Sequence, residues 1–147
     1  MIRVVLLDAG PLGQLSHPRK NHEIQFWLRR LLHAGVDVVV PEIADYEVRR
    51  ELRRIGSIRG IERLDLLACL ARYLPITTAA MREAAELWAQ ARREGLPTAD
   101  PKALDGDVIL AAQAIVLRGS GYAPVVATDN VGHLSRYCSA KMWTEID

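Results

Sequence analysis

Apolar residues along the chain follow two patterns, short continuous runs and longer stretches with helical spacing. Residues 2–7, IRVVLL, place apolar residues on both alternating faces, as in a parallel strand that helices cover on both sides. The same kind of run predicts strands at 37–41 (DVVVP) and 123–129 (APVVATD), with a last strand at 141–146 (KMWTEI).

Between these runs, apolar residues recur every three or four positions and predict helices. The first lies at 21–35, where Asn21 is placed to cap the start and Gly35 to end it. A short apolar segment, YLPIT, precedes a helix at 78–95, and the loop LPTADPK follows that helix. Strands that alternate with helices favour the α/β fold class with a mainly parallel sheet. The remaining predicted helices are 42–56, 61–72 and 104–119.

The composition indicates one ordinary domain. The chain has 147 residues, 50% of them hydrophobic, and carries a net charge of +1, which argues against the diffuse positive field of a strongly basic nucleic-acid binder. No apolar stretch approaches the roughly 18 residues of a membrane span, and the N-terminus lacks a signal-peptide pattern. Cys69 and Cys138 stand apart, without a CxxC or Cys/His cluster, so no disulfide framework or zinc site is indicated. We therefore expect a soluble, cytoplasmic protein with no membrane association.

Acidic residues follow the predicted strands at their carboxyl ends. Asp8 comes directly after the first strand, and Asp129 ends the run APVVATD. In open α/β sheets the ligand site lies beyond this edge, so both side chains are expected there. Asp105 and Asp107 fall in the expected first turn of the apolar helix at 104–119. Asp105 has the alternative role of an N-cap, whereas Asp107 lies one step inside.

The helix at 42–56 supplies a further carboxylate, but periodicity does not choose between Glu47 and Glu51. Glu47 falls at the margin of the apolar side, and Glu51 falls within it. The alternative is that both are surface glutamates paired with arginines one turn away. Several carboxylates that converge on one cleft repel one another unless a hard cation neutralises them. Oxygen ligands without Cys or a His cluster favour Mg²⁺ or Mn²⁺, which commonly serve phosphodiester hydrolysis.

Four segments, taken in order, resemble the PIN-domain nucleases and particularly the VapC-type ribonuclease toxins of toxin–antitoxin pairs. The segments are LLDAGPLG, PEIADYEVRREL, LDGDVILAAQA and VVATDNVGHLSRY, and together they span nearly the whole chain. The resemblance implies a single PIN-like nuclease domain over 1–147, with a Rossmann-like α/β/α fold in three layers. It implies that Asp8, Glu47 and Asp107 are catalytic ligands of Mg²⁺ or Mn²⁺, which selects Glu47 over Glu51. It further implies an RNA substrate, an antitoxin that covers the cleft, and a homodimer.

The fourth segment departs from the pattern of many relatives. Thr128 is followed by Asp129 and Asn130, with Leu134 where Phe is frequent in the family. Either Asp129 ligates the metal directly, or Asn130 holds a metal-bound water while Asp129 faces solvent, and we favour a mixed site that uses both. The resemblance gives Thr128 a supporting hydroxyl role beside the ligands. Asp105 is retained as a further candidate ligand.

Arginines cluster on the polar face of the helix that carries Glu47. Arg49, Arg50 and Arg53 are placed to contact RNA phosphates, which supply most non-specific affinity. The alternatives are a solvated helix face and a contact with an acidic antitoxin tail. His17 is expected in the loop after Asp8, where it could approach substrate. The other histidines are expected at surface or structural positions, and the tryptophans in the core or an interface: His22, His33 and His133; Trp27, Trp88 and Trp143.

Three other functions compete with the nuclease interpretation. A haloacid-dehalogenase-like phosphatase also begins with an aspartate after an apolar strand, but it needs a second Asp where Gly10 stands. A dinucleotide-binding domain is disfavoured because Gly10 and Gly13 do not form GxGxxG. The third is a catalytically weak PIN-like domain that binds a partner, whose mark would be a degraded acidic set.

Overall fold

A five-stranded sheet forms the centre of the molecule. The computed structural model describes residues 1–17, 19, 21–95 and 101–147, and these residues form the sheet in the order β3-β2-β1-β4-β5. Every pair of neighbouring strands is parallel, as predicted. The strands are β1 (Ile2–Leu7), β2 (Asp37–Pro41), β3 (Arg72–Leu74), β4 (Tyr122–Ala127) and β5 (Ala140–Lys141).

The central strand β1 buries both of its faces. Val5 and Leu7 pack into one core cluster, while Val4 and Leu6 pack into another on the opposite side of the sheet. All four side chains are 0% exposed. This confirms the prediction that the continuous apolar run is a strand covered on both faces.

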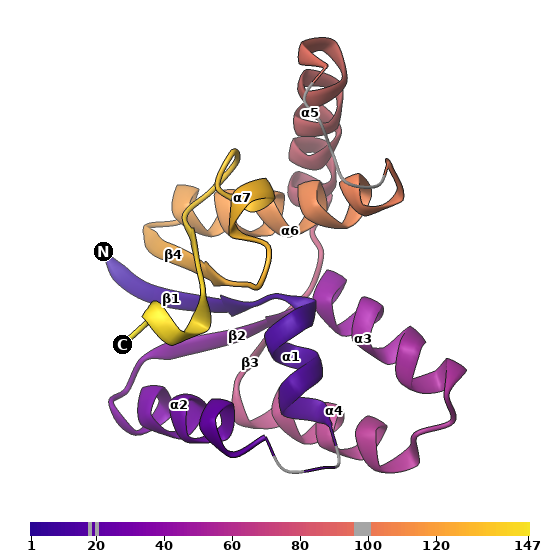
Figure 1. Cartoon of the computed structure of the whole chain (residues 1–147). Coiled ribbons are helices and arrows are strands. Elements are labelled where there is room, and N and C mark those ends of the chain that lie inside the picture. Colours follow the sequence, from indigo (N-terminus) through magenta and orange to yellow (C-terminus); the bar gives the residue numbers. More distant parts are fainter. Residues whose placement is uncertain (18, 20, 96–100) are drawn as a thin grey trace.

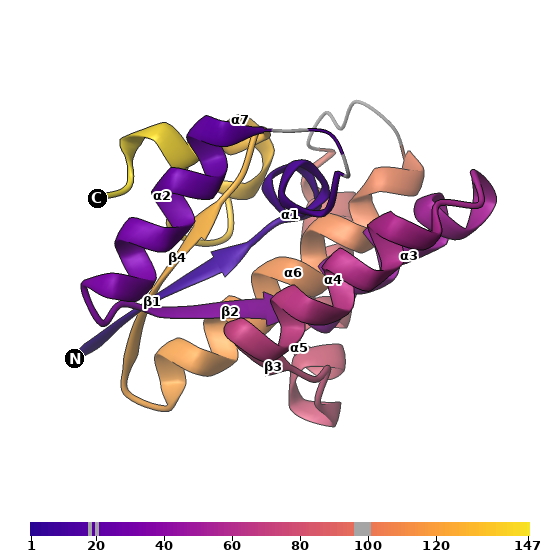
Figure 2. The same ribbon diagram turned by 90° about the horizontal axis from the view of Figure 1, so that it is seen from below.

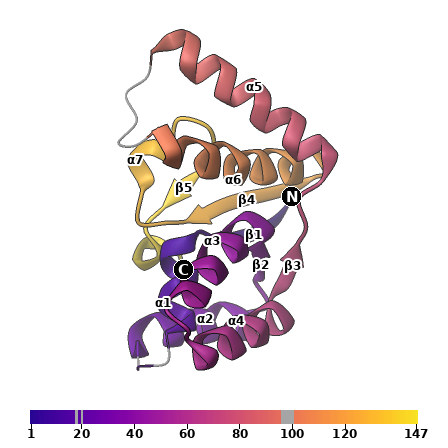
Figure 3. The same ribbon diagram turned by 90° about the vertical axis from the view of Figure 1, so that its right-hand side faces the viewer.

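Helices form a layer on each face of the sheet (Figures 1 and 3). The Val5 and Leu7 face is covered by helices of the first half of the chain, including α3 through Ala44 and Val48. The helices of this half are α1 (Ala9–Ser16), α2 (His22–His33), α3 (Glu42–Arg54) and α4 (Ile58–Leu70).

The opposite layer consists of α6 (Pro101–Gly119), with α5 (Thr78–Glu94) packed on its outer side, as Figure 3 shows. Leu110 and Leu117 of α6 pack in one cluster with Val4 and Leu6, whereas α5 meets α6 mainly through small alanines. This is the predicted α/β/α architecture in three layers. Within the described residues, no helix combines the length and apolar character needed to cross a bilayer.

Gln113 ties the second layer to the first. This α6 side chain is 2% exposed. Its Nε2 donates to the carbonyl of Leu74 at 2.9 Å, and its Oε1 accepts from the backbone N–H of Ile43 at 3.5 Å. The start of α3 and the end of β3 are therefore fixed to the helix that carries Asp107.

The segment after Asp8 is a helix, so the prediction of a loop there is wrong. Pro11 lies in the first turn of α1, where its missing N–H costs nothing. Gly13 faces α3, and a Cβ placed on it would lie 3.9 Å from Val48 Cγ2, an ordinary van der Waals distance. His17 stands at the C-cap of α1.

The predicted last strand is mostly a 3-10 helix. Only Ala140–Lys141 pair with β4, and η1 (Trp143–Glu145) follows. Trp143 packs on Trp27 with ring centroids 5.7 Å apart, and Trp27 Nε1 donates to the Ile146 carbonyl at 2.8 Å. A helical turn is favoured because it brings Trp143 and the buried Ile146 onto the same helix, α2.

The short β5 leaves part of the β4 edge uncovered. The backbone N–H of Val126 donates to the Ser139 carbonyl at 2.9 Å and therefore points toward β5. The residue two positions earlier, which faces the same edge, is Pro124, and proline has no N–H to donate.

The start of α6 corrects the interpretation of Asp105. The helix begins at Pro101, so Asp105 lies beyond its first turn and is not the N-cap. Of the loop predicted at 96–102, residues 96–100 lie outside the described residues, and residues 101 and 102 belong to α6.

Candidate active site

Asp8 stands at the carboxyl end of β1, where the strand meets α1 (Figure 2). Its Oδ1 accepts from the N–H of Ala9 at 2.7 Å, and its Oδ2 accepts from the hydroxyl of Thr128 at 2.7 Å. The Asp8 N–H donates to the carbonyl of Ala127 at 3.0 Å. The carboxylate is thereby held in one orientation between two neighbouring strands.

Thr128 links this carboxylate to the turn after β4. The residue is fully buried, and its hydroxyl also accepts from the backbone N–H of Asn130 at 2.8 Å. The Thr128 hydroxyl therefore donates one hydrogen bond, to Asp8, and accepts one, from Asn130. Thr128 therefore orients Asp8 rather than presenting a free group to a substrate.

Glu47 and Asp107 approach this edge from α3 and α6. Glu47 faces the first half of α6, where a Cβ placed on Gly106 would lie 3.0 Å from Glu47 Oε1. Glycine at this position leaves room for the carboxylate. Glu51, by contrast, is exposed and pairs with Arg54 at 2.5 Å. The structure thus places Glu47 toward α6 and Glu51 in solvent.

Burial raises the pKa of all three carboxyl groups, and the charge of Asp8 adds to the rise at the other two. Burial raises the pKa of Asp8, which Thr128 and Ala9 partly offset by hydrogen bonding. Burial and then the charge of Asp8 raise the pKa of Glu47, against the attraction of Arg50. Burial and the charge of Asp8 raise the pKa of Asp107 to about 6. The charge of Asp8 thus acts on both of the other carboxyl groups.

Asp129 lies on the open side of Asp8. Its side chain is exposed, its charge raises the pKa of Asp8, and its Oδ2 accepts from Gln14 Nε2 at 3.4 Å. A Cβ placed on Gly10 would collide with the Asp129 carboxylate, so this glycine makes room for it. The neighbouring Asn130 is exposed and contributes its backbone N–H to Thr128.

Two further polar side chains reach the site without having been predicted from the sequence. Gln14 of α1 contacts Asp129 as described, and His133 of α7 (Val131–Leu134) places Nδ1 at 3.9 Å from Asp107 Oδ2. His133 follows Thr128 by five residues in the VVATDNVGH segment, and that proximity was the only signal for it.

These residues fit a divalent cation by their chemistry. They offer carboxylate oxygens that repel one another and are partly withdrawn from water, which is the condition that Mg²⁺ or Mn²⁺ relieves. Among the described side chains, no group of at least three His, Cys, Asp or Glu lies at the spacing of a formed metal site. Asp105 is exposed beside Met81 and Trp88, in the hollow between α5 and α6.

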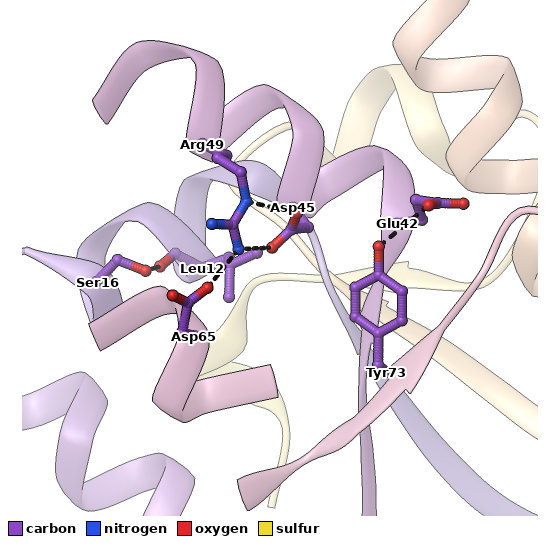
Figure 4. Close-up of polar contacts among 7 residues, drawn as sticks. All are labelled: Leu12, Ser16, Glu42, Asp45, Arg49, Asp65 and Tyr73. Atoms are coloured by element: carbon purple, nitrogen blue, oxygen red, sulfur yellow. Dashed lines mark hydrogen bonds and ion pairs between the residues drawn. The ribbon is translucent and has the colours of Figure 1, made fainter. Parts of the chain in front are cut away.

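The predicted RNA-contacting arginines have different environments. Arg49 is engaged by Asp45 at 3.0 Å and by Asp65 of α4 at 2.8 Å (Figure 4). Arg50 lies over the ring of Tyr46, with its guanidinium carbon 5.1 Å from the ring centroid. Arg53 is exposed. Arg49 thus joins α3 to α4, while Arg50 and Arg53 lie on the solvent-exposed side of α3.

Solved structures of other proteins share this fold. VapBC2 of Rickettsia felis, bound to a DNA fragment from its promoter, has 13% identity and a TM-score of 0.75, over 95% of this chain and 98% of that chain. FitAcB of Neisseria gonorrhoeae has 20% identity and a TM-score of 0.71, over 97% and 99%. VapC20 of Mycobacterium tuberculosis, a sarcin-ricin loop cleaving toxin, has 15% identity and a TM-score of 0.59, over 90% and 94%.

The sequence comparison identifies the family. No curated protein matches the sequence. The model of the PIN domain matches residues 5–136, a range that contains every carboxylate of the candidate site. Because this match covers most of the chain, and the solved structures share its fold, the chain belongs to the PIN domain family.

Proposed function

We propose that this PIN domain is an endoribonuclease that uses Mg²⁺ or Mn²⁺ to hydrolyse phosphodiester bonds of single-stranded RNA. The observation that carries the proposal is the group of Asp8, Glu47 and Asp107, which burial, together with the charge of Asp8 on the other two, makes costly to ionise. Within the described residues, none of the three forms an ion pair with Lys or Arg. A fold that keeps such a group at the carboxyl edge of its sheet is suited to an external cation.

In this proposal Asp8, Glu47 and Asp107 hold the cation, with Asp129 and Asn130 as further ligands on the open side. When bound, the cation neutralises the carboxylates, acidifies water and balances the charge that develops on the phosphate. Thr128 and the Ala9 N–H keep Asp8 in one orientation through that change. Overall, a water oxygen bonds to phosphorus, one ester P–O bond breaks, and the leaving oxygen takes a proton.

We further propose that the protein is the cytoplasmic toxin of a toxin–antitoxin pair and works as a homodimer. The support is the fold shared with VapBC and FitAB complexes and with a VapC toxin that cleaves the sarcin-ricin loop. A cognate antitoxin would then cover the acidic edge and silence the nuclease. Coexpression with the neighbouring gene product, followed by copurification and an activity assay, tests this partner.

The nuclease is tested with the purified full chain on a pool of structured and unstructured RNA, with Mg²⁺, Mn²⁺ or EDTA. We expect cleavage that needs the metal and falls by at least about 100-fold in Asp8→Asn and Glu47→Gln, the loss typical of removing a charge-stabilising group. Glu51→Gln is the matched control on the same helix, and its exposed position predicts cleavage at the wild-type rate.

A second measurement does not depend on activity. Mn²⁺ should raise the melting temperature of the wild type, because a ligand that binds only the folded state stabilises it. The rise should be lost in Asp8→Asn and kept in Glu51→Gln. A folded wild type that neither cleaves RNA nor responds to Mn²⁺ would contradict the proposal, whereas Mn²⁺ binding without cleavage of any RNA would favour the partner-binding alternative.

A further inference from the structure

A hollow on the open side of α3 lies beside the acidic site. It has a volume of about 560 Å³ and extends from α3 to the segment that follows β3. This volume falls in the range of pockets that hold small organic molecules. The residues that matter here are Tyr46, Arg49, Arg50, Arg53, Tyr73 and Ile76.

An aromatic side chain and a guanidinium form one wall of this hollow. The Tyr46 side chain is 56% exposed although its ring is large and apolar. Arg50 lies over that ring at 5.1 Å from its centroid. Exposed aromatic rings and guanidinium planes are the groups on which unpaired RNA bases stack.

The acidic groups of the hollow are already satisfied by the protein. Glu42 accepts from the Ile76 N–H at 2.8 Å and from the Tyr73 hydroxyl at 3.2 Å. Asp45 accepts two hydrogen bonds from Arg49 (Figure 4). No carboxylate among the described residues forms an ion pair with Arg50 or Arg53. Three arginines stand against two carboxylates in the described lining of the hollow, so it presents a net positive charge to a ligand.

The hollow and the acidic site are linked through neighbouring residues of α3, although Glu47 itself does not line the hollow. Tyr46 precedes Glu47 in the chain, and Arg50 lies one helical turn after Tyr46 on the same side. Arg50 is close enough to Glu47 to oppose the rise in the pKa of that carboxyl. An RNA strand that runs from the acidic site toward the hollow would reach Arg50 and Tyr46 first.

We propose that this hollow holds an unpaired nucleotide of the RNA next to the scissile phosphate, with its base stacked on the Tyr46–Arg50 pair and its phosphate beside Arg53. The inference rests on the proposed nuclease function and adds to it a reason for acting on single strands. A paired base is already stacked in its helix, so it cannot reach this wall.

The test compares Tyr46→Ala, Tyr46→Phe and Phe26→Ala in cleavage of a short single-stranded RNA with Mg²⁺. Tyr46→Ala should raise KM by about 10-fold with little change in kcat, since one lost base stack is worth about 1–3 kcal/mol. Tyr46→Phe keeps the ring and should match the wild type. Phe26 is the matched control because its side chain is 64% exposed on α2, outside the hollow.

Binding provides a second readout. In RNA that carries 2-aminopurine at successive positions, one position should lose fluorescence on binding to the wild type, in EDTA as well as with Mg²⁺. That loss should be absent with Tyr46→Ala and present with Tyr46→Phe. Arg53→Gln should lower the slope of log affinity against log salt by about 0.7, the value for one phosphate contact on a single strand.

The outcomes separate this inference from the proposed function. Wild-type cleavage that Tyr46→Ala leaves unchanged in KM, with the 2-aminopurine signal intact, overturns the inference and leaves the nuclease standing. A wild type that neither binds nor cleaves RNA overturns both. If Tyr46→Ala instead converts a dimer to a monomer in sedimentation and KM does not change, the hollow is a contact between two copies of the chain and not an RNA subsite.

Discussion

Helix α3 contributes to two clusters of carboxylates, one paired with an arginine and one without such a partner in the described part of the chain. Toward α4, Asp45 is 8% exposed and is neutralised by Arg49, which also binds Asp65 (Figure 4). Toward α6, Glu47 faces Asp8 and Asp107, and all three carboxyl groups have a raised pKa. The carboxylates of the Asp45 cluster are paired with an arginine of the protein. Those of the Glu47 cluster form no ion pair with Lys or Arg among the described residues.

On this one helix, Asp45 has a structural role and Glu47 belongs to the candidate active site. Asp45 and Glu47 are two residues apart and therefore point to different sides of α3. A carboxylate that already has its cation contributes to folding, whereas one that lacks it opposes folding and is available to an added ion. Three substitutions test this contrast.

The largest effect is expected when the Asp45 cluster is broken. Arg49→Met leaves Asp45 buried without its cation and should lower the free energy of unfolding by about 3 kcal/mol, measured by urea denaturation. The matched control is Arg53→Met, an exposed arginine on the same helix, for which a change within about 0.5 kcal/mol is expected. Equal stability of the two variants would show that the Arg49 network contributes little.

The Glu47 cluster should respond in the opposite direction. The pKa of Asp107 is about 6 instead of 3.8, so between these values the folded state binds more protons than the unfolded state. The free energy of unfolding therefore falls as the pH rises through this window. Asp107→Asn removes the penalty and should stabilise the metal-free protein at pH 7.5 by about 1–2 kcal/mol.

This gain has two internal checks. It should disappear as the pH is lowered below the ordinary pKa of an aspartate, because the wild-type carboxyl is then protonated in both states. Added Mn²⁺ should stabilise the wild type more than the variant. If Asp107→Asn is less stable than the wild type at pH 7.5 in EDTA, Asp107 belongs with Asp45 as a structural carboxylate.

The smallest change in stability, with a clear change in activity, is expected at Gly106. Gly106→Ala removes the entropic cost of a helical glycine, about 0.5–1 kcal/mol, while its Cβ displaces Glu47 by a few tenths of an ångström. The melting temperature should change little, and the rate of RNA cleavage should fall. Gly119→Ala is the control, since nothing lies within 4 Å of a Cβ there.

Strands and long helices could be predicted from the sequence because their patterns are local. IRVVLL is apolar at every position except Arg3, and the helix that ends at Gly95 follows 3.6-residue spacing. Helix α1 was missed because Gly10, Pro11 and Gly13 are typical of turns. In the structure Gly10 makes room for Asp129, and Pro11 lies in the first turn of the helix, where its missing N–H is tolerated.

The site was predicted in part for a similar reason. Asp8 and Asp129 follow strands, so topology alone places them at one edge, but the choice of Glu47 over Glu51 came from the family resemblance. Gln14, Gln113 and His133 carry no such pattern. Their roles depend on contacts between segments far apart in the chain, such as the 70 residues that separate Gln113 from Ile43.

Pro124 on the uncovered stretch of β4 also limits how partners can bind. An open strand edge invites another chain to extend the sheet, which is a route to aggregation as well as to recognition. Because Pro124 lacks an N–H, an incoming strand loses a hydrogen bond at the position where β5 has stopped covering the edge. Extension of the sheet from β4 is thus disfavoured at this position, which leaves the outer side of the short strand β3 as the other edge where an added strand could pair.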